Sequence, residues 1–237
     1  MRIAAVGDLH CTRQAHGTFR GLFAEASTAA DAVVLCGDLT DYGLPEEADV
    51  LADELSAGAT VPVIAVLGNH DHESDQPDAV RARLTAVGAH VLDGEGVEID
   101  GVGFAGTKGF AGGFGTHGLG AWGESAIKAF VQAAIEEELK LETSLGRLRT
   151  RHRVALLHYS PILQTVVGEP KEIYAWLGST RLEEPIDRYE VTAAFHGHAH
   201  FGSLEGRTRG GVPVYNVSHP LLRANGHERG FRVVEVG

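Results

Sequence analysis

Residues 32–41 read Ala-Val-Val-Leu-Cys-Gly-Asp-Leu-Thr-Asp, an apolar run that ends in a glycine and two carboxylates. An unbroken β-rich run of this length is typical of a strand buried on both faces of a parallel sheet. The carboxyl ends of such strands form the usual ligand sites of open α/β sheets. The stretch therefore predicts a central strand with Asp38 and Asp41 at its functional end.

Other apolar runs, over 3–6, 63–67, 154–157 and 191–195, also end in side chains that offer oxygen or nitrogen donors. The motifs that follow them are Gly7-Asp8-Leu9-His10, Gly68-Asn69-His70-Asp71, His158 and Gly197-His198-Ala199-His200. Because ligand sites of α/β sheets lie beyond the carboxyl ends of the strands, we expect these ends to converge. They would bring carboxylates, an amide and several imidazoles into one place.

Helical patterns separate these runs, over 17–30, 45–57, 77–87 and 124–149. In the first half of the chain this alternation predicts βαβ units around a parallel sheet. Short runs over 90–92, 97–99 and 102–105 have Asp-Gly and Gly signals between them that indicate hairpins. Runs over 203–207, 212–217 and 231–236 are joined by glycine-rich turns, so the second half looks more antiparallel. The length predicts one domain over 1–237.

The charge balance restricts the partners. The chain has 20 Lys and Arg against 32 Asp and Glu, a formal net charge of −12. This argues against a basic groove for nucleic acid, so a phosphorylated substrate must be attracted locally. The first residues reach Asp8 too soon for a signal peptide, and no segment has the roughly 20 apolar residues of a membrane span. With two cysteines only, these features predict a cytoplasmic protein without a membrane partner.

A site with so many carboxylates and lone pairs is unfavourable unless a cation fills it. The donors at the strand ends are oxygen and nitrogen, without thiolate. This mixture suits Mn, Fe, Zn, Co or Ni better than Ca or Mg, and better than a structural zinc site rich in cysteine.

Taken in order, the motifs resemble the calcineurin-like metallophosphoesterase superfamily, whose pattern is D-x-H, G-D-x-x-D, G-N-H-D/E, a separate His and G-H-x-H. Every motif is intact between residues 8 and 200. The resemblance implies an α/β fold, a four-layer α-β-β-α sandwich of two mixed β-sheets flanked by helices. It also implies two divalent or trivalent metal ions at the sheet ends, with Mn or Fe preferred.

Site residues follow from the resemblance position by position. It implies that the first ion is held by Asp8, His10, Asp38 and His200, and the second by Asp38, Asn69, His158 and His198. Asp38 would bridge the two ions, because one carboxylate has two oxygens. His70 would protonate the leaving oxygen or contact the phosphoryl group, and Asp71 would orient His70.

The resulting hypothesis is a dinuclear metal-dependent phosphoesterase. It would hydrolyse a small phosphodiester, such as a cyclic nucleotide, or a phosphomonoester by attack of a metal-bridging hydroxide. A nuclease on the same fold is an alternative that the net charge disfavours. A non-catalytic metal-binding scaffold is another, disfavoured because all seven ligands and His70 are present. The residues indicate no oligomeric state.

Several roles stay open at this stage. The glycine-rich loop 106–123 and the segment 164–180 form either a substrate-contacting rim or ordinary surface, and their aromatic side chains could stack on a base. Asp41 either supports the site or stabilises its own turn. For His196 a hydrogen-bonded core histidine is preferred to a third-metal ligand, and His219 is undecided. Cys11 and Cys36 are interpreted as small buried residues rather than ligands.

Overall fold

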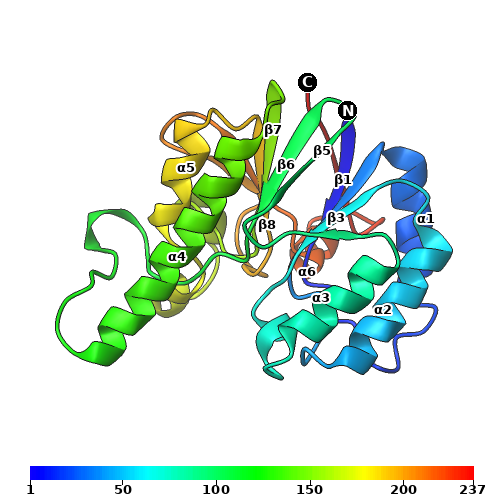
Figure 1. The fold of residues 1–237 in the computed structure, drawn as a ribbon, viewed down its shortest axis with the longest axis horizontal. Helices are drawn as coiled ribbons and strands as arrows, with labels where there is room; N and C mark the ends of the chain where they lie inside the picture. The colour runs from blue at the N-terminus through cyan, green and yellow to red at the C-terminus, as the bar shows by residue number, and fades with distance from the viewer.

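The structure, a computed structural model that describes residues 1–237, consists of two β-sheets that pack against each other between two layers of helices (Figure 1). The first sheet has the strand order β11 (Arg232–Glu235), β1 (Arg2–Val6), β2 (Ala32–Cys36), β3 (Val63–Val66) and β4 (His90–Val91). The second has the order β5 (Gly96–Ile99), β6 (Val102–Gly106), β7 (His152–Leu156), β8 (Ala193–His196), β10 (Pro213–Asn216) and β9 (Glu205–Arg207).

Side chains that alternate along the strands separate the layers. In β1, Ala4 and Val6 belong to the core beneath the helices α1 (Arg20–Ala29), α2 (Pro45–Gly58) and α3 (Pro77–Ala86). Ile3 and Ala5 belong to the core between the sheets. A third core joins the second sheet to α4 (Ser125–Arg147) and α5 (Glu183–Arg188). The predicted α-β-β-α sandwich of two mixed sheets is therefore confirmed.

Helices predicted over 45–57, 77–87 and 124–149 are confirmed to within two residues at either end. The helix predicted from residue 17 begins later, at Arg20. Gly17 takes a backbone φ of 79°, which is outside the helical region. The buried carboxylate of Glu54 accepts hydrogen bonds from the backbone N–H groups of Gly17, Phe19 and Arg20, so a side chain of α2 sets the start of α1.

The expectation of a more antiparallel second half is confirmed for β9 and β11 and is wrong for the centre of the second sheet. Strands β6, β7, β8 and β10 are parallel neighbours, and only the edge strands β5 and β9 run antiparallel within their sheet. β11 is antiparallel as well, but it pairs with β1 in the first sheet. Of the expected hairpins, β5–β6 is present, whereas β4 joins β3 as a parallel neighbour. The crossover between β7 and β8 contributes to the difference, because its one α-helix, α5, has only six residues and leaves little periodic signal.

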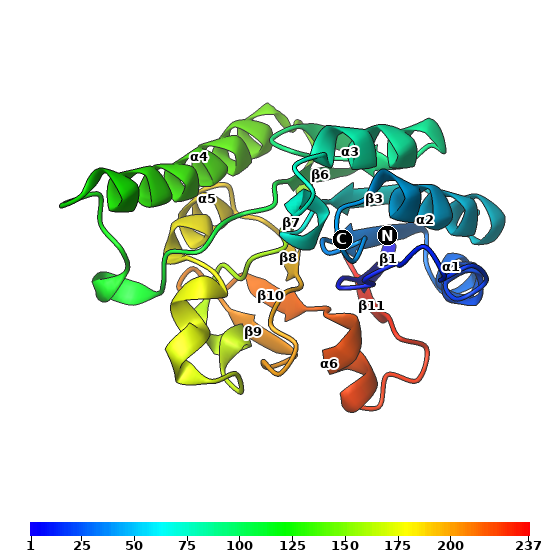
Figure 2. The ribbon, with the colours of Figure 1, turned by 90° about the horizontal axis from the view of Figure 1, so that it is seen from below.

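Parallel strands place the predicted motifs at one end of the molecule. β1 runs downward from the N mark of Figure 1, so the loop after it lies at the lower end. Figure 2 looks at this end, where the strands lie between α1–α3 and α4–α5. The remaining elements are α6 (His219–Ala224) and the 3-10 turns η1 (His70–His72), η2 (Gly115–His117), η3 (Leu163–Val166), η4 (Lys171–Trp176) and η5 (Thr180–Leu182). None of the helices combines the length and apolar character needed to cross a membrane.

Candidate metal centre

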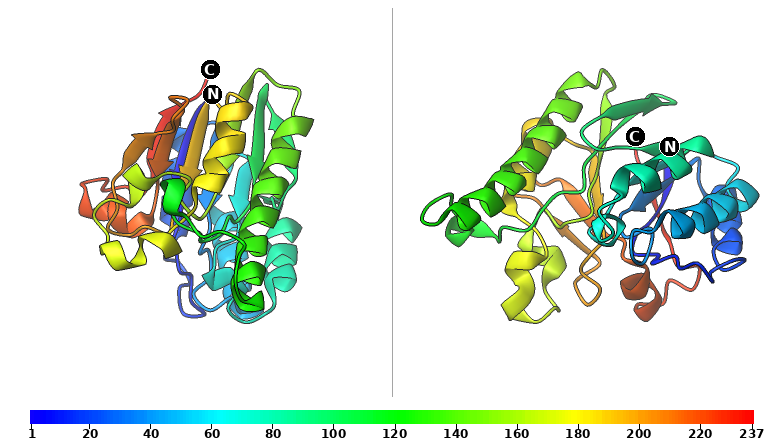
Figure 3. Two further views of the ribbon diagram at one scale, coloured as in Figure 1. Left: turned by 90° about the vertical axis from the view of Figure 1, so that its left-hand side faces the viewer. Right: turned by 60° about the horizontal axis from the view of Figure 1, so that its bottom comes forward.

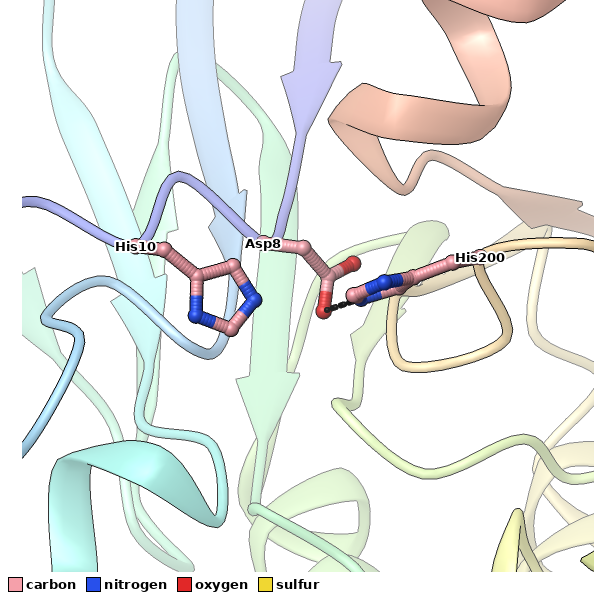
Figure 4. A group of neighbouring side chains, drawn as sticks. All are labelled: Asp8, His10 and His200. Carbon is pink, nitrogen blue, oxygen red and sulfur yellow. Dashed lines mark ion pairs between the residues drawn. The ribbon is translucent and has the colours of Figure 1, made fainter.

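The loops after β1 and β8 bring Asp8, His10 and His200 together (Figure 4). His200 Nε2 lies 3.2 Å from Asp8 Oδ1. The backbone N–H of His198 donates to both Asp8 oxygens at 3.0 Å, which holds the buried carboxylate in place. The hydrogen bond to Asp8 raises the pKa of His200, and Asp8 has its own pKa lowered against the effect of burial. We call these three residues the exposed half of the centre.

A second group joins Asp38, His158 and His198, with Asn69 beside it. His158 Nε2 lies 3.3 Å from Asp38 Oδ1 and 2.8 Å from Asn69 Oδ1. His158 Nδ1 is 3.0 Å from the Cys36 carbonyl, which can only accept, so Nδ1 carries the proton. Burial lowers the pKa of His158 well below its ordinary value, and that of His198 to about 3, so both rings are neutral. Asn69, His158 and His198 form the buried half.

Asp38 lies between the two halves. Its Oδ1 accepts the backbone N–H of His70 at 2.8 Å and faces His158, while its Oδ2 lies 4.0 Å from His10 Nε2 and from His70 Nε2. Burial, with the neighbouring charges of Asp8 and Asp71, raises the pKa of Asp38 to about 9. A carboxylate in this position needs a cation to ionise at neutral pH.

The donors present fit metal ions. His10 Nε2 is buried without a hydrogen-bond partner although it is aimed at Asp38. The unprotonated His158 Nε2 faces the oxygens of Asn69 and Asp38, so three sets of lone pairs converge without a proton between them. Cations placed among these atoms would satisfy all of them. His10, Asp38 and His70 also form a possible ligand group, so geometry alone leaves His70 open as a ligand.

Strained backbone presents these side chains. Asp8, His10, Asp38 and His198 have positive φ values of 56°, 46°, 48° and 70°, a conformation that costs non-glycine residues about 1–3 kcal/mol each. Hydrogen bonds between the loops after β1 and β2 hold it, from Asp8 N to Gly37 O at 2.9 Å and from His10 N to Asp38 O at 3.0 Å. Left-handed conformations at these positions make the loops turn sharply enough for neighbouring strand ends to share one site.

Two motif glycines are explained by close approach. A Cβ atom on Gly68 would lie 2.1 Å from Asp38 Oδ1, and one on Gly197 would lie 2.5 Å from Asp8 Oδ2. Both separations are far below van der Waals contact. Glycine at these positions thus makes room for the two buried carboxylates of the centre.

The contact expected between Asp71 and the His70 ring is not made. The Asp71 carboxylate accepts the backbone N–H groups of Leu39, Thr40 and Gly68 at 2.7–3.1 Å, and the Thr40 hydroxyl at 2.5 Å. His70 Nδ1 instead lies 2.6 Å from the backbone carbonyl of Asp41, so it is Nε2 that faces the Asp38 carboxylate. Asp71 therefore ties the loop after β2 to the loop after β3, and the Asp41 carbonyl orients His70.

The structure decides between the alternative roles left open for Asp41, His196 and the two cysteines. The Asp41 side chain lies 3.4 Å from His10 Nδ1, so it supports the site rather than only its own turn. His196 bonds to the Gly197 carbonyl and the Thr165 hydroxyl through its two ring nitrogens, as expected of a hydrogen-bonded core histidine. Cys11 and Cys36 are buried and free, and neither belongs to a possible ligand group.

The two segments predicted as a rim contact each other. Backbone N–H groups of Gly112 and Gly113 donate to the carbonyls of Ala175 and Gly178 at 2.9 Å. The Trp176 carbonyl lies 3.3 Å from His198 Nε2, so the segment 164–180 reaches the centre. The loop 106–123 starts beside the centre, where the Lys108 carbonyl accepts the N–H of His158, and then leads away toward the N-terminal end of α4 (Figure 3), where Trp122 is 77% exposed.

Aromatic rings extend outward from the buried half. Tyr159 packs on His198 at 4.5 Å between ring centroids, and Phe110 packs on Tyr159 at 5.9 Å. Phe130 continues the series at 5.0 Å from Phe110 and 5.6 Å from the exposed Trp176. Two other candidates for stacking, Phe114 and Tyr174, pack instead on the small core of Val166, Leu177 and Ala199.

Sequence reasoning missed Lys108. The Lys108 ammonium lies 5.2 Å from the centroid of the Tyr159 ring, which packs on His198, and its charge lowers the pKa of Asp38 against the larger effect of burial. Its backbone carbonyl accepts the N–H groups of His158 and Tyr159 at 3.0 and 3.1 Å. Its position after a strand, like that of His158, was the only available signal.

Paired sheets with clustered carboxylate and imidazole donors at one end define an α/β protein with a candidate two-metal centre. The chain belongs to the calcineurin-like phosphoesterases, whose sequence profile matches residues 1–202. This agrees with the resemblance of the motifs. Comparison with curated protein sequences gives no significant match.

Solved structures share the fold at low sequence identity. Phosphopantetheinyl hydrolase from Mycobacterium tuberculosis is similar with a TM-score of 0.69 and 16% identity, over 98% of this chain and 95% of that one. The protein TT1561 of Thermus thermophilus has a TM-score of 0.57 and 16% identity, over 99% and 98% of the two chains. A putative 5′-nucleotidase from Staphylococcus aureus has a TM-score of 0.55 and 16% identity, over 91% of this chain and 48% of that one.

Proposed function

We propose that the chain is a dinuclear metal-dependent hydrolase of small phosphate esters. The observation that carries the proposal is the place of Asp38, whose two carboxylate oxygens face donor groups on opposite sides. Asp8, His10, Asp38 and His200 would hold one ion, and Asp38, Asn69, His158 and His198 the other. The oxygen and nitrogen donors suit Mn, Fe, Zn, Co or Ni, and the resemblance to the family favours Mn or Fe among them.

When bound, the two cations supply Lewis acidity and a nucleophile at neutral pH. The chain's own residues hold the ligands in place and keep His158 and His198 neutral. Cys36 fixes the tautomer of His158 through its carbonyl, and Asp41 does the same for His70. His70 Nε2 lies near Asp38 on the accessible side of the site, where it could pass a proton to a leaving oxygen.

Small substrates suit the surroundings of the centre. Trp176, which is 58% exposed at the outer end of the aromatic series, offers a ring face to an organic group such as a nucleotide base, which supports a cyclic nucleotide or another phosphodiester. A phosphopantetheinyl group and a 5′-nucleotide, named for two structural neighbours, are also small phosphate esters. The net charge of −12 disfavours a long polynucleotide.

The test is hydrolysis of bis-p-nitrophenyl phosphate beside p-nitrophenyl phosphate by metal-stripped protein to which Mn²⁺ is added. Asp38→Ala serves as the control. We expect turnover that needs both the metal and Asp38, and the ratio of the two rates distinguishes a diesterase from a monoesterase. Turnover that is unchanged in Asp38→Ala, or protein that binds no metal, would overturn the proposal and favour a scaffold.

A further inference from the structure

A cavity of about 190 Å³ lies beside the candidate metal centre. Leu67, directly before the Gly68-Asn69-His70 motif, forms part of its wall, and Lys108, after β6, forms another part. His72 and Arg81 line it from η1 and α3, and Val91 lines it from β4. The cavity thus opens between the ends of the two sheets, next to the buried half of the centre.

Among the lysine and arginine side chains that line this cavity, Lys108 is the one that has no carboxylate partner. Arg81 pairs with Glu95 at 2.9 Å, and the cavity residue Asp93 pairs with Lys140 at 2.8 Å. Lys108 Nζ has no carboxylate within 4.0 Å, and its one hydrogen bond goes to the Gly109 carbonyl at 2.9 Å. An ammonium group has three donors, so two of them are free to bind a ligand.

The surroundings hold Lys108 in position. Its Nζ lies 4.9 Å from the centroid of the Phe110 ring and 5.2 Å from that of Tyr159. The nearby carboxylate of Glu137 is already bound, by the Thr107 hydroxyl, the Gly109 N–H and Lys140. The remaining acid of the cavity, Asp78, lies in the first turn of α3, where the helix dipole favours its charge.

We propose that the cavity receives the organic part of the substrate and that Lys108 binds a second anionic group, a phosphate or a carboxylate, on that part. The inference rests on the proposed phosphoesterase function. Lys108 Nζ lies 5.2 Å from the centroid of the Tyr159 ring, and that ring packs on His198 of the buried half at 4.5 Å, so the ammonium lies near the centre without pairing with its carboxylates. In a chain of net charge −12, this local cation attracts a substrate that the overall charge repels.

The test compares substrates that differ only in a second anion. One pair is 6-phosphogluconate and glucitol 6-phosphate, both open-chain, which tests a carboxylate, and the other is fructose 1,6-bisphosphate and fructose 6-phosphate, which tests a phosphate. Both pairs are measured with the metal-loaded wild type, with Lys108→Met and Lys108→Arg, and with Lys128→Met as a control, because Lys128 is exposed on α4.

We expect the wild type to prefer at least one doubly anionic substrate. In Lys108→Met the ratio of kcat/KM within that pair should fall roughly ten- to a hundredfold, the effect of losing a charged hydrogen bond, while Lys108→Arg retains part of it. Lys128→Met should leave the ratio as in the wild type. An equal loss for both members of each pair would assign Lys108 to the scissile phosphate and overturn the proposal, as would no loss.

A binding measurement separates this proposal from the proposed function. Calorimetry gives the affinity of wild type and Lys108→Met for 6-phosphogluconate and for fructose 1,6-bisphosphate without turnover. If no protein hydrolyses any ester, the proposed function fails. If Lys108→Met then binds either compound more weakly than the wild type does, the anion site is still supported. If the two proteins bind each compound with the same affinity, the anion site is contradicted.

Discussion

The two histidines of the exposed half are partly open to solvent, whereas His158 of the buried half is closed in by protein and His198 beside it is partly buried. The His10 and His200 side chains are 23% and 32% exposed, and that of His158 is 0% exposed. Burial keeps His158 and His198 neutral, so they present lone pairs without any metal. His200 instead shares a proton with Asp8, and a metal ion must displace this proton before it can bind. The buried half is therefore preformed for a cation, and the exposed half has to exchange a proton for one.

The largest effect should come from His70, whose ring packs against His10 of the exposed half at 4.6 Å. His70→Ala should lower kcat about 10²–10⁴-fold, because it removes a general acid. Metal content, measured by elemental analysis, should stay at two ions per chain. Loss of one ion in this variant would show instead that His70 is a ligand, as the geometry also permits.

Gly68→Ala should disturb both halves together. The new Cβ would lie 2.1 Å from Asp38 Oδ1, so the shared carboxylate must move. We expect a loss of turnover of at least about 10²-fold, as for a displacement of about 1 Å in a catalytic site, with reduced content of both metals. Gly21→Ala in α1 is the matched control, because its Cβ would meet nothing within 4 Å. Equal activity of the two variants would refute the role given to Asp38.

Metal retention at low pH directly compares the halves. The pKa of His200 is raised, so it protonates first as the pH falls, and the ion of the exposed half should be released at a higher pH than that of the buried half. Two steps of release are expected in the wild type. His200→Ala should keep one tightly bound ion, and its affinity for the other should fall by more than the 10- to 100-fold typical of outer-shell partners. Simultaneous release of both ions in the wild type would contradict the comparison.

Asp38→Asn should stabilise the metal-free protein. Because the folded-state pKa is about 9 against an ordinary 3.8, the folded chain binds the proton more tightly than the unfolded chain. Stability of the metal-free wild type should thus fall as the pH rises between these values. At pH 8 the variant should have a Tm higher by about 5–10 °C, with a smaller gain at pH 4. Equal thermal scans at pH 8 would show that Asp38 is not held as an uncompensated buried acid.

Strand ends were the part of the site most readable from sequence. The apolar run before Asp38 and the matching runs elsewhere predicted which loops converge, and the structure brings Asp8, His10, Asp38, Asn69, His158, His198 and His200 together. The prediction of converging loops succeeded because a buried parallel strand is recognised by its unbroken apolar run, and parallel neighbours end at the same edge of the sheet.

Features that depend on distant packing were not readable. Between β7 and β8 the only α-helix is α5, with six residues, so the sequence carries little periodic signal that these two strands are parallel. The partners of Asp71 come from two other loops, and the place of Lys108 depends on how the chain after β6 packs on Tyr159 and Glu137. Such contacts follow from the tertiary arrangement rather than from neighbouring residues.

Pairing between β1 and β11 has a consequence for the order in which the molecule can be built during translation. β1 is synthesised well before one of its two strand partners, at Arg232–Glu235, with Arg2 opposite Glu235, and well before His198, whose N–H binds the Asp8 carboxylate. Contacts this remote in sequence close slowly. The nascent first sheet must therefore keep one edge of β1 unpaired until residues 232–235 have been synthesised, and the Asp8 carboxylate lacks its backbone donor until His198 has been synthesised. A ribosome-bound chain should gain protease resistance late and in one step.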